Sequence, residues 1–159
     1  SVVCVTDSIY NAFLADYSEG KAFMHSHTYA GNPLACSCAL AVIKILKRDN
    51  IIEKANELGQ WLSKEFEQRF MQIDKVGGVR HIGLINALEL VKDRSTKEPF
   101  DSSLRLGYRI YQNALKKGLL LRPIGDILYF NPPLNIKKEE LKKAMDIAYE
   151  AITEELSKI

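Results

Sequence analysis

The sequence predicts an α/β fold of the α+β kind, in which a small, mostly antiparallel sheet is covered by helices. Two features of the 159 residues predict it. Three segments carry apolar residues three and four positions apart, the period of a helix with one buried side. Residues 79–91 and 119–131 are rich in β-branched and aromatic residues and contain glycine turns, which is typical of paired strands. The order helix, helix, strand, strand, helix, strand, strand, helix indicates one sheet layered with helices.

The first 32 residues hold few predicted elements. Ser1–Val5 is apolar and β-branched, so we expect a short buried strand there. Thr6 or Asp7 can cap a short helix that ends near Ala15. The polar and aromatic segment after it is predicted to be an irregular connection, and long loops of this kind are often functional. Because the chain opens on an apolar strand without Met, we expect a fragment or a processed chain.

Two helices are predicted next. Asn32 is a good N-cap and Pro33 is favoured at a first helical position, which predicts a helix to about Lys47. Asn50 and Glu53 have the spacing of a capping box and predict the start of a second helix. The apolar stripe of that helix is Ala55, Leu58, Leu62 and Phe66.

The middle of the chain is predicted to form strands and then a helix. Val79–Val91 is compatible with two strands or with one long bent strand, and a charged loop follows it. Asp101 and Ser102 predict the start of a helix that Gly118 ends in the C′ position. The stripe predicted to be buried on this helix is Leu104, Tyr108, Tyr111 and Leu115.

The last part is predicted to be a hairpin and a helix. Residues 119–123 and 127–131 predict two strands joined by a tight glycine turn, and Pro132 with Pro133 ends the second strand. A final helix begins near Lys138. Its predicted buried side is Leu141, Met145, Ala148, Ile152 and Leu156.

Composition excludes several classes of partner. The 22 basic and 20 acidic residues nearly balance, so the strong basic face that nucleic acid or an anionic membrane requires is not expected. The three cysteines are an odd number without framework spacing, which favours reduced thiols and a cytoplasmic protein. No apolar run approaches the roughly 20 residues of a membrane span, and the N-terminus lacks the basic region of a signal peptide.

The stretch "HSHTYAGNPLAC" is a candidate anion site. Ser26, Thr28 and Gly31 bring hydroxyl donors and a permissive backbone to a helix N-terminus, which suits a phosphate. The alternative is a capped helix after a surface turn, since most caps bind nothing. A zinc site is not predicted, although His25, His27, Cys36 and Cys38 lie in one stretch. The cysteines are two apart on a helix and face different sides, and the usual CxxC spacing is missing.

Arg122 is the second candidate. It lies in the apolar segment "GLLLRPIGDILYF", and a guanidinium buried there must meet an anion. That anion is either an internal carboxylate, such as Asp126 or Glu89, or a substrate carboxylate held by bidentate hydrogen bonds. Tyr129 nearby is of a type found more often in a core than in a site. The sequence shows no catalytic constellation of its own.

One segment resembles a known family. "KAFMHSHTYAGNPLACSCALAVIKIL" closely resembles the segment just after the cofactor lysine in class III aminotransferases, which use pyridoxal phosphate, and its Thr-x-x-Gly-Asn-Pro core is shared across that family. The resemblance extends along the whole chain. It implies the C-terminal part of a fold-type I aminotransferase. Residues 1–48 would be the trailing segment of the large cofactor domain, with an interface loop and a linking helix, and residues 49–159 the small C-terminal domain.

The resemblance also implies roles for single residues. In the family this loop crosses a homodimer interface, and the residue matching Thr28 hydrogen-bonds the pyridoxal phosphate group in the partner subunit's site. The residue matching His27 lies at the same phosphate, and the residue matching Ser26 contacts substrate. The commonest family pattern has Gly and Pro in place of Ser26 and His27. The arginine matching Arg122 binds the substrate carboxylate, with Tyr129 beside it.

Within the family, the Cys after "PLA" and the segment "RPIGDILYFNPP" favour one activity. It is the step of biotin biosynthesis that converts 8-amino-7-oxononanoate to 7,8-diaminononanoate, with S-adenosylmethionine as the expected amino donor. The family's cofactor lysine is expected upstream of this chain, so no catalytic residue is expected here and the fragment alone should be inactive. The alternatives are an ornithine, acetylornithine or 4-aminobutyrate aminotransferase, an aminomutase, or a non-catalytic domain that dimerises or binds a small anion.

Overall fold

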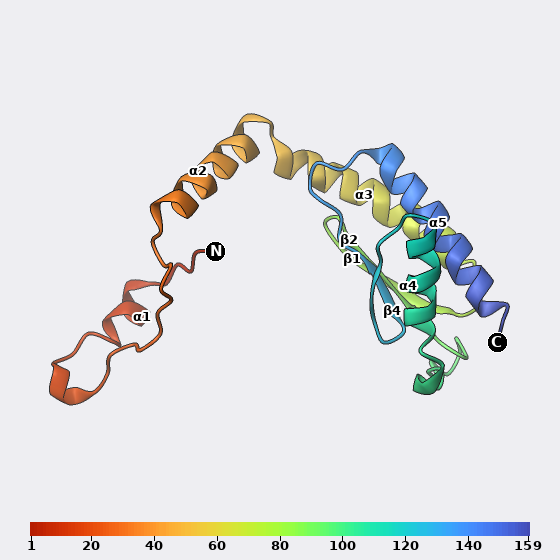
Figure 1. The fold of residues 1–159 in the computed structure, drawn as a ribbon, viewed down its shortest axis with the longest axis horizontal. Helices are drawn as coiled ribbons and strands as arrows, with labels where there is room; N and C mark the ends of the chain where they lie inside the picture. The colour runs from red at the N-terminus through yellow and green to blue at the C-terminus, as the bar shows by residue number, and fades with distance from the viewer. The chain divides into compact units, whose positions relative to one another are not determined.

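The computed structural model describes residues 1–159 and divides them into two compact units, Ser1–Ile43 and Lys44–Ile159. Figure 1 colours the first unit red to orange and the second yellow-orange to blue. The two units differ in how much interior they build, so each is described by itself.

The first unit contains no buried residue, and its elements before Pro33 are short. Helix α1 spans Asp7–Asn11, and a 3-10 turn spans Tyr17–Glu19. The predicted strand at Ser1–Val5 is wrong, because no other strand pairs with it and its side chains are exposed. The helix predicted to reach Ala15 ends four residues earlier. Its N-cap, Thr6, makes no side-chain hydrogen bond, so little holds a longer helix.

Helix α2 spans Pro33–Arg48 and confirms the predicted start. The Asn32 side-chain oxygen accepts hydrogen bonds from the backbone N–H groups of Leu34 (3.0 Å) and Ala35 (3.2 Å). Proline at the first position has no N–H to satisfy, so an Asn-Pro start leaves few free donors at this end.

Helix α3 spans Ile51–Phe70, as predicted, but the capping box does not form. Asn50 takes a left-handed conformation (φ 52°) and makes no side-chain cap hydrogen bond. Asn is one of the few residues that adopt this conformation readily, and here it separates two consecutive helices. The predicted stripe is largely buried: Ala55, Leu62 and Phe66 are buried, and Leu58 is half-buried.

The sheet has four antiparallel strands in the order β1-β2-β4-β3, which confirms the predicted fold class. The strands are β1 Val76–Ile82, β2 Ile85–Leu90, β3 Arg122–Ile124 and β4 Ile127–Phe130. Residues 79–91 therefore form two strands, and Gly83 (φ 54°) lies in the turn between them. The second hairpin turns at Gly125 (φ 57°). Both hairpins have the tight glycine turns that the sequence indicates.

Helix α4 spans Leu106–Lys116 and starts later than predicted. Asp101 instead caps a 3-10 turn, Ser102–Leu104, and Arg105 is left-handed (φ 46°), which separates that turn from the helix. The predicted stripe is wrong, because Tyr108 and Leu115 are exposed. The residues that α4 buries are Leu106, Gly107, Ile110 and Ala114. Gly118 (φ 89°) follows the helix in the predicted C′ position.

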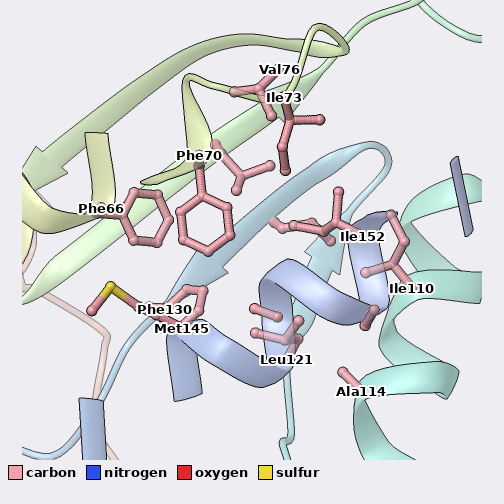
Figure 2. Packing of buried hydrophobic residues seen from close by; sticks show 14 of the residues in the cluster. Phe66, Phe70, Ile73, Val76, Ile110, Ala114, Leu121, Phe130, Met145 and Ile152 are labelled. Carbon is pink, nitrogen blue, oxygen red and sulfur yellow. The ribbon is translucent and has the colours of Figure 1, made fainter. Parts of the chain in front are cut away.

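The core lies between the helices and one face of the sheet. Figure 2 shows Phe66 and Phe70 of α3 beside Phe130 of β4 and Met145. The ring centres of Phe66 lie 4.5 Å from Phe70 and 5.2 Å from Phe130, a separation typical of favourable aromatic pairs. Met145 belongs to helix α5, Lys138–Leu156, whose predicted buried side is confirmed except that Leu156 is half-buried.

The opposite face of the sheet is open. One row of this face runs across all four strands, from Arg80 through Ala87 and Tyr129 to Arg122. Ile82 and Ile124 of the same face are 75% and 66% exposed, whereas Leu88 and Leu128 of the helix-covered face are at most 1% exposed. The residues of this row are therefore placed by a rigid sheet and remain accessible to a ligand.

Candidate functional site

The loop Ser26–Thr28 presents free hydrogen-bonding groups. All its residues are exposed, and the Thr28 hydroxyl makes no hydrogen bond within the chain. The backbone N–H of Ala30 donates to the His27 carbonyl at 2.9 Å, which closes a turn around Thr28. The rings of His25 and His27 meet edge to face with centres 5.0 Å apart. The loop thus offers two hydroxyls and an imidazole with no competing partner.

The groups that remain free to donate to a phosphate are side chains of this loop and not the N–H groups of the helix end. The first N–H groups of α2 already donate to Asn32, so they are not free for an anion. The Thr28 and Ser26 hydroxyls and the His27 ring can still donate to phosphate oxygens. The cap of the helix and the candidate donors to an anion are therefore separate, although the sequence alone placed them together.

The neighbouring cysteines take no part in a cluster. Cys36 and Cys38 are free and exposed on α2. No group of three or more His, Cys, Asp or Glu side chains is placed to hold a metal ion.

Arg122 and Tyr129 come together on the second hairpin. They are register partners across β3 and β4 on the open face of the sheet. Both also line a cavity of about 320 Å³ at the end of the hairpin, which extends to the helix-covered side, since Leu121, Phe130 and Leu141 line it too. Its wall is otherwise mostly apolar, including Leu119, Pro132 and Ile136. A guanidinium at the edge of an apolar cavity suits a ligand that has a carboxylate and a hydrocarbon chain.

The expected burial of Arg122 is wrong, and of the two anions left open for it the internal carboxylate is not observed. Arg122 is exposed at the start of an edge strand, not buried, because the buried residue is its neighbour Leu121. It also forms no ion pair with either expected carboxylate, Asp126 or Glu89. Its five donors are thus available to a ligand.

Asp126 has a different role, which the sequence did not indicate. Its side chain accepts a hydrogen bond at 3.0 Å from the backbone N–H of Gly107, in the first turn of α4. The N-cap residue of that helix, Arg105, provides no side-chain cap, so Asp126 replaces it from 19 residues away. Only the absence of a local capping side chain before residue 106 could have pointed to this contact.

A larger hollow of about 760 Å³ holds none of the candidate residues. It lies among Phe100, Leu104 and Leu156, and its charged groups are already occupied. Lys75 donates to the carbonyl of Lys92, and the Lys92 ammonium pairs with Glu98 at 2.6 Å. The lysines of this cavity thus already have hydrogen-bond partners within the chain.

The length and the apolar character of a helix decide whether it can span a membrane. None of them is both long enough and apolar enough to cross a lipid bilayer.

Comparison with known proteins extends these observations. The aminotransferase class-III family matches residues 1–152. The adenosylmethionine-8-amino-7-oxononanoate aminotransferase of Methanocaldococcus jannaschii is 42% identical over 149 residues, which are 94% of this chain and 32% of that protein. The protein of the same name from Anoxybacillus flavithermus is 40% identical, with 96% of this chain and 34% of that protein covered.

Solved structures agree with the sequence comparison. The crystal structure of the Methanocaldococcus jannaschii enzyme aligns with a TM-score of 0.84 and 42% identity, covering 94% of this chain and 34% of that chain. A pyridoxal-phosphate-bound aminotransferase mutant from Vibrio fluvialis aligns with a TM-score of 0.81 at 26% identity, over 89% of this chain and 31% of that chain.

The chain spans about a third of the length of the relatives it matches. Its fold is that of the C-terminal part of such an enzyme. The family match includes the loop with Ser26–Thr28 and the hairpin with Arg122. On its sequence and its fold, the chain belongs to the class III aminotransferases.

Proposed function

We propose that this chain is part of a transaminase of biotin biosynthesis that converts 8-amino-7-oxononanoate to 7,8-diaminononanoate, with S-adenosylmethionine as the amino donor. The observation that carries the proposal is the agreement of the relatives. Five of them, from five organisms, are 40–42% identical over most of the chain and bear the name of this activity.

The chain contributes two parts to that enzyme in this proposal. Residues 1–48 are the end of the large cofactor domain, and residues 49–159 are the small domain. The enzyme is a cytoplasmic homodimer. The exposure of apolar side chains in the first unit supports this assignment, since Val2, Val3 and Leu34 are 77–87% exposed. Surfaces this apolar are usually covered by further protein.

The loop Ser26–Thr28 holds the cofactor phosphate of the partner subunit in this proposal. Pyridoxal phosphate, when bound, supplies the electron-withdrawing ring that allows an amino group to be transferred between substrates. Thr28 donates its hydroxyl to the phosphate, His27 adds an N–H donor, and Ser26 lies toward the substrate. These residues bind and orient. The proposal gives no lysine of this chain the role of carrying the cofactor.

Arg122 holds the substrate carboxylate in the same proposal. Its guanidinium is unpaired, and two parallel N–H groups match the two oxygens of a carboxylate. The apolar wall beside it, with Leu119 and Ile136, accommodates the methylene chain of the ketone. Tyr129, opposite Arg122 on β4, limits where the carboxylate can lie.

The first test is the Michaelis constant of the complete enzyme for 8-amino-7-oxononanoate. Loss of one partner of a desolvated charge pair costs about 2–5 kcal/mol, so Arg122→Ala should raise KM by at least about 30-fold. Arg80→Ala is the matched control, because Arg80 is an exposed, unpaired arginine at the other end of the same row. An unchanged KM in Arg122→Ala would remove Arg122 from the site.

A second test addresses the loop. Thr28→Val removes the hydroxyl and keeps the shape, so the complete enzyme should lose its cofactor more readily, whereas Thr28→Ser should retain it. The measurement is the dissociation constant of pyridoxal phosphate followed by its absorbance. Equal constants in all three proteins would contradict the phosphate role.

A panel of ketone substrates and amino donors, with ornithine, 4-aminobutyrate and lysine among them, decides the activity.

A further inference from the structure

Each hairpin of the sheet turns against a glycine of a helix. The turn of β1 and β2 at Gly83 lies against Gly59 of α3, and the turn of β3 and β4 at Gly125 lies against Gly107 of α4. In both places a Cβ atom on the helix glycine would collide with the carbonyl oxygen of the turn glycine. The helix backbones can approach the turns this closely only because they have no side chain there.

The second turn is held by two hydrogen bonds of a kind that the first turn lacks. The Asp126 side chain accepts a hydrogen bond from the Gly107 N–H at 3.0 Å, and the Asp126 carbonyl accepts one from the Leu90 N–H, also at 3.0 Å. One turn residue thus connects the hairpin to both α4 and β2. A carboxylate at the N-terminal end of a helix also interacts favourably with the helix dipole.

This arrangement matters for Arg122 because β3 pairs with a single neighbouring strand. The strand is three residues long, lies at the edge of the sheet and pairs only with β4. Arg122 is the first residue of β3, at the end of the strand that lies away from the Gly125 turn. The residue before it, Leu121, is buried. Beyond its pairing with β4 and the packing of Pro123 beside Gly107, β3 is anchored by Leu121 at one end and by the Asp126 turn at the other.

We propose that Asp126 is a positioning residue for carboxylate recognition: by fixing the β3–β4 turn on α4 it holds the hairpin at the angle at which Arg122 meets the substrate carboxylate. This inference rests on the proposed function, since it assumes that Arg122 binds that carboxylate. Asp126 itself touches no substrate. It acts through the hairpin, so its loss should weaken recognition of the carboxylate and leave the chemistry of amino transfer unchanged.

The test compares two substrates in the complete enzyme, 8-amino-7-oxononanoate and its methyl ester, which lacks the anion. For the acid, Asp126→Ala should raise KM about 10-fold, the scale of one misplaced charge-assisted hydrogen bond, and change kcat by less than about 2-fold. For the ester, KM should be the same in both proteins. Asp126→Asn keeps an oxygen acceptor for the Gly107 N–H and should restore KM for the acid.

Gly59→Ala is the matched control. It should disturb the first hairpin as Asp126→Ala disturbs the second, yet that hairpin carries neither Arg122 nor Tyr129. It should lower the melting temperature and leave the ratio of the acid and ester KM values unchanged. A merely structural role for Asp126 predicts the same pattern in Asp126→Ala as in this control.

The outcomes separate the inference from the proposed function. If Arg122→Ala abolishes the difference between acid and ester and Asp126→Ala leaves it intact, Asp126 is not a positioning residue, although the proposed function stands. If Arg122→Ala also leaves the difference intact, the proposed carboxylate contact is itself wrong. If Asp126→Ala does not fold, Asp126→Glu, which displaces the carboxylate by one methylene, is measured with the same two substrates and the same criteria.

Discussion

The two units of this chain use similar apolar segments in opposite ways. In Lys44–Ile159, helices α3, α4 and α5 bury their apolar stripes against one face of a sheet, and Leu62, Phe70 and Ile152 are fully buried. In Ser1–Ile43 no residue is buried. The composition of α2 would suit a core helix, yet Leu40 and Val42 are 58% and 54% exposed. An apolar pattern therefore shows that a surface needs a partner, and it does not show that the partner lies in the same chain.

The largest expected effect comes from emptying the core of the second unit. Phe66→Ala in the 159-residue chain removes a fully buried ring that packs against Phe70 and Phe130. It should lower the free energy of unfolding by about 3–5 kcal/mol. Leu40→Ala, in the exposed part of α2, should change it by less than about 0.5 kcal/mol. Urea denaturation followed by circular dichroism measures both, and equal effects would break the contrast between the units.

A smaller effect should come from the half-buried Arg94, which ties the end of α3 to β1. Its guanidinium donates to the carbonyls of Met71 (2.9 Å), Ile73 (2.5 Å) and Val76 (2.9 Å). Hydrogen bonds from charged donors contribute about 1.5–3 kcal/mol, so Arg94→Ala should destabilise the chain on that scale. Arg80→Ala, which removes an arginine with no partner, is the control. A change no larger than that of the control would show that these hydrogen bonds do not hold the connection.

The smallest effect concerns acid stability. Burial by itself raises the pKa of the Glu155 carboxyl, but hydrogen bonds from Lys158, Arg109 and Asn113 outweigh it, and the net pKa is lowered. A group whose pKa is lowered in the folded state stabilises the fold at pH values above the ordinary carboxyl pKa of about 4.3. That stabilisation is lost as the pH falls through the lower pKa of the folded state. Glu155→Gln should cost about 1 kcal/mol at pH 7 and flatten the decline of stability toward low pH.

The measurement for this prediction is the midpoint of urea denaturation between pH 7 and pH 3. The variant and the unmodified chain should converge as the pH falls, because protonation of Glu155 removes from the unmodified chain the charge that the variant lacks at every pH. Parallel curves would mean that Glu155 does not set the acid stability of the second unit.

The sequence predicts the fold well where local signals decide it. Asn32 and Pro33 specify the start of α2 by themselves, and the glycine turn at Gly125 specifies the second hairpin, whereas residues 79–91 were also compatible with one bent strand. It fails where a contact from outside the local segment decides. The start of α4 depends on the left-handed Arg105 and on Asp126 from another turn, so the predicted start and stripe are both displaced.

The candidate site shows the same division. Residue chemistry alone made Ser26, Thr28 and Arg122 candidates for contact with an anion, but it expected a buried arginine and left an internal carboxylate and a substrate carboxylate equally open as its partner. The exposure of Arg122 follows from its place at the sheet edge, which the sequence of β3 does not reveal. The assignment of a cofactor phosphate and a substrate carboxylate to these residues comes from the family, because their spacing carries no such information.

Backbone hydrogen exchange tests the contrast between the units most directly, measured on the 159-residue chain and on the complete enzyme of the proposed function. The account predicts that amides of α3, β2 and α5 are equally protected in both proteins, because their partners lie within the second unit. It predicts that amides of α1 and of the first turns of α2 exchange rapidly in the short chain and are protected only in the complete enzyme. Strong protection of α1 and α2 in the short chain would contradict the account, since the first unit would then be stable without the rest of the enzyme.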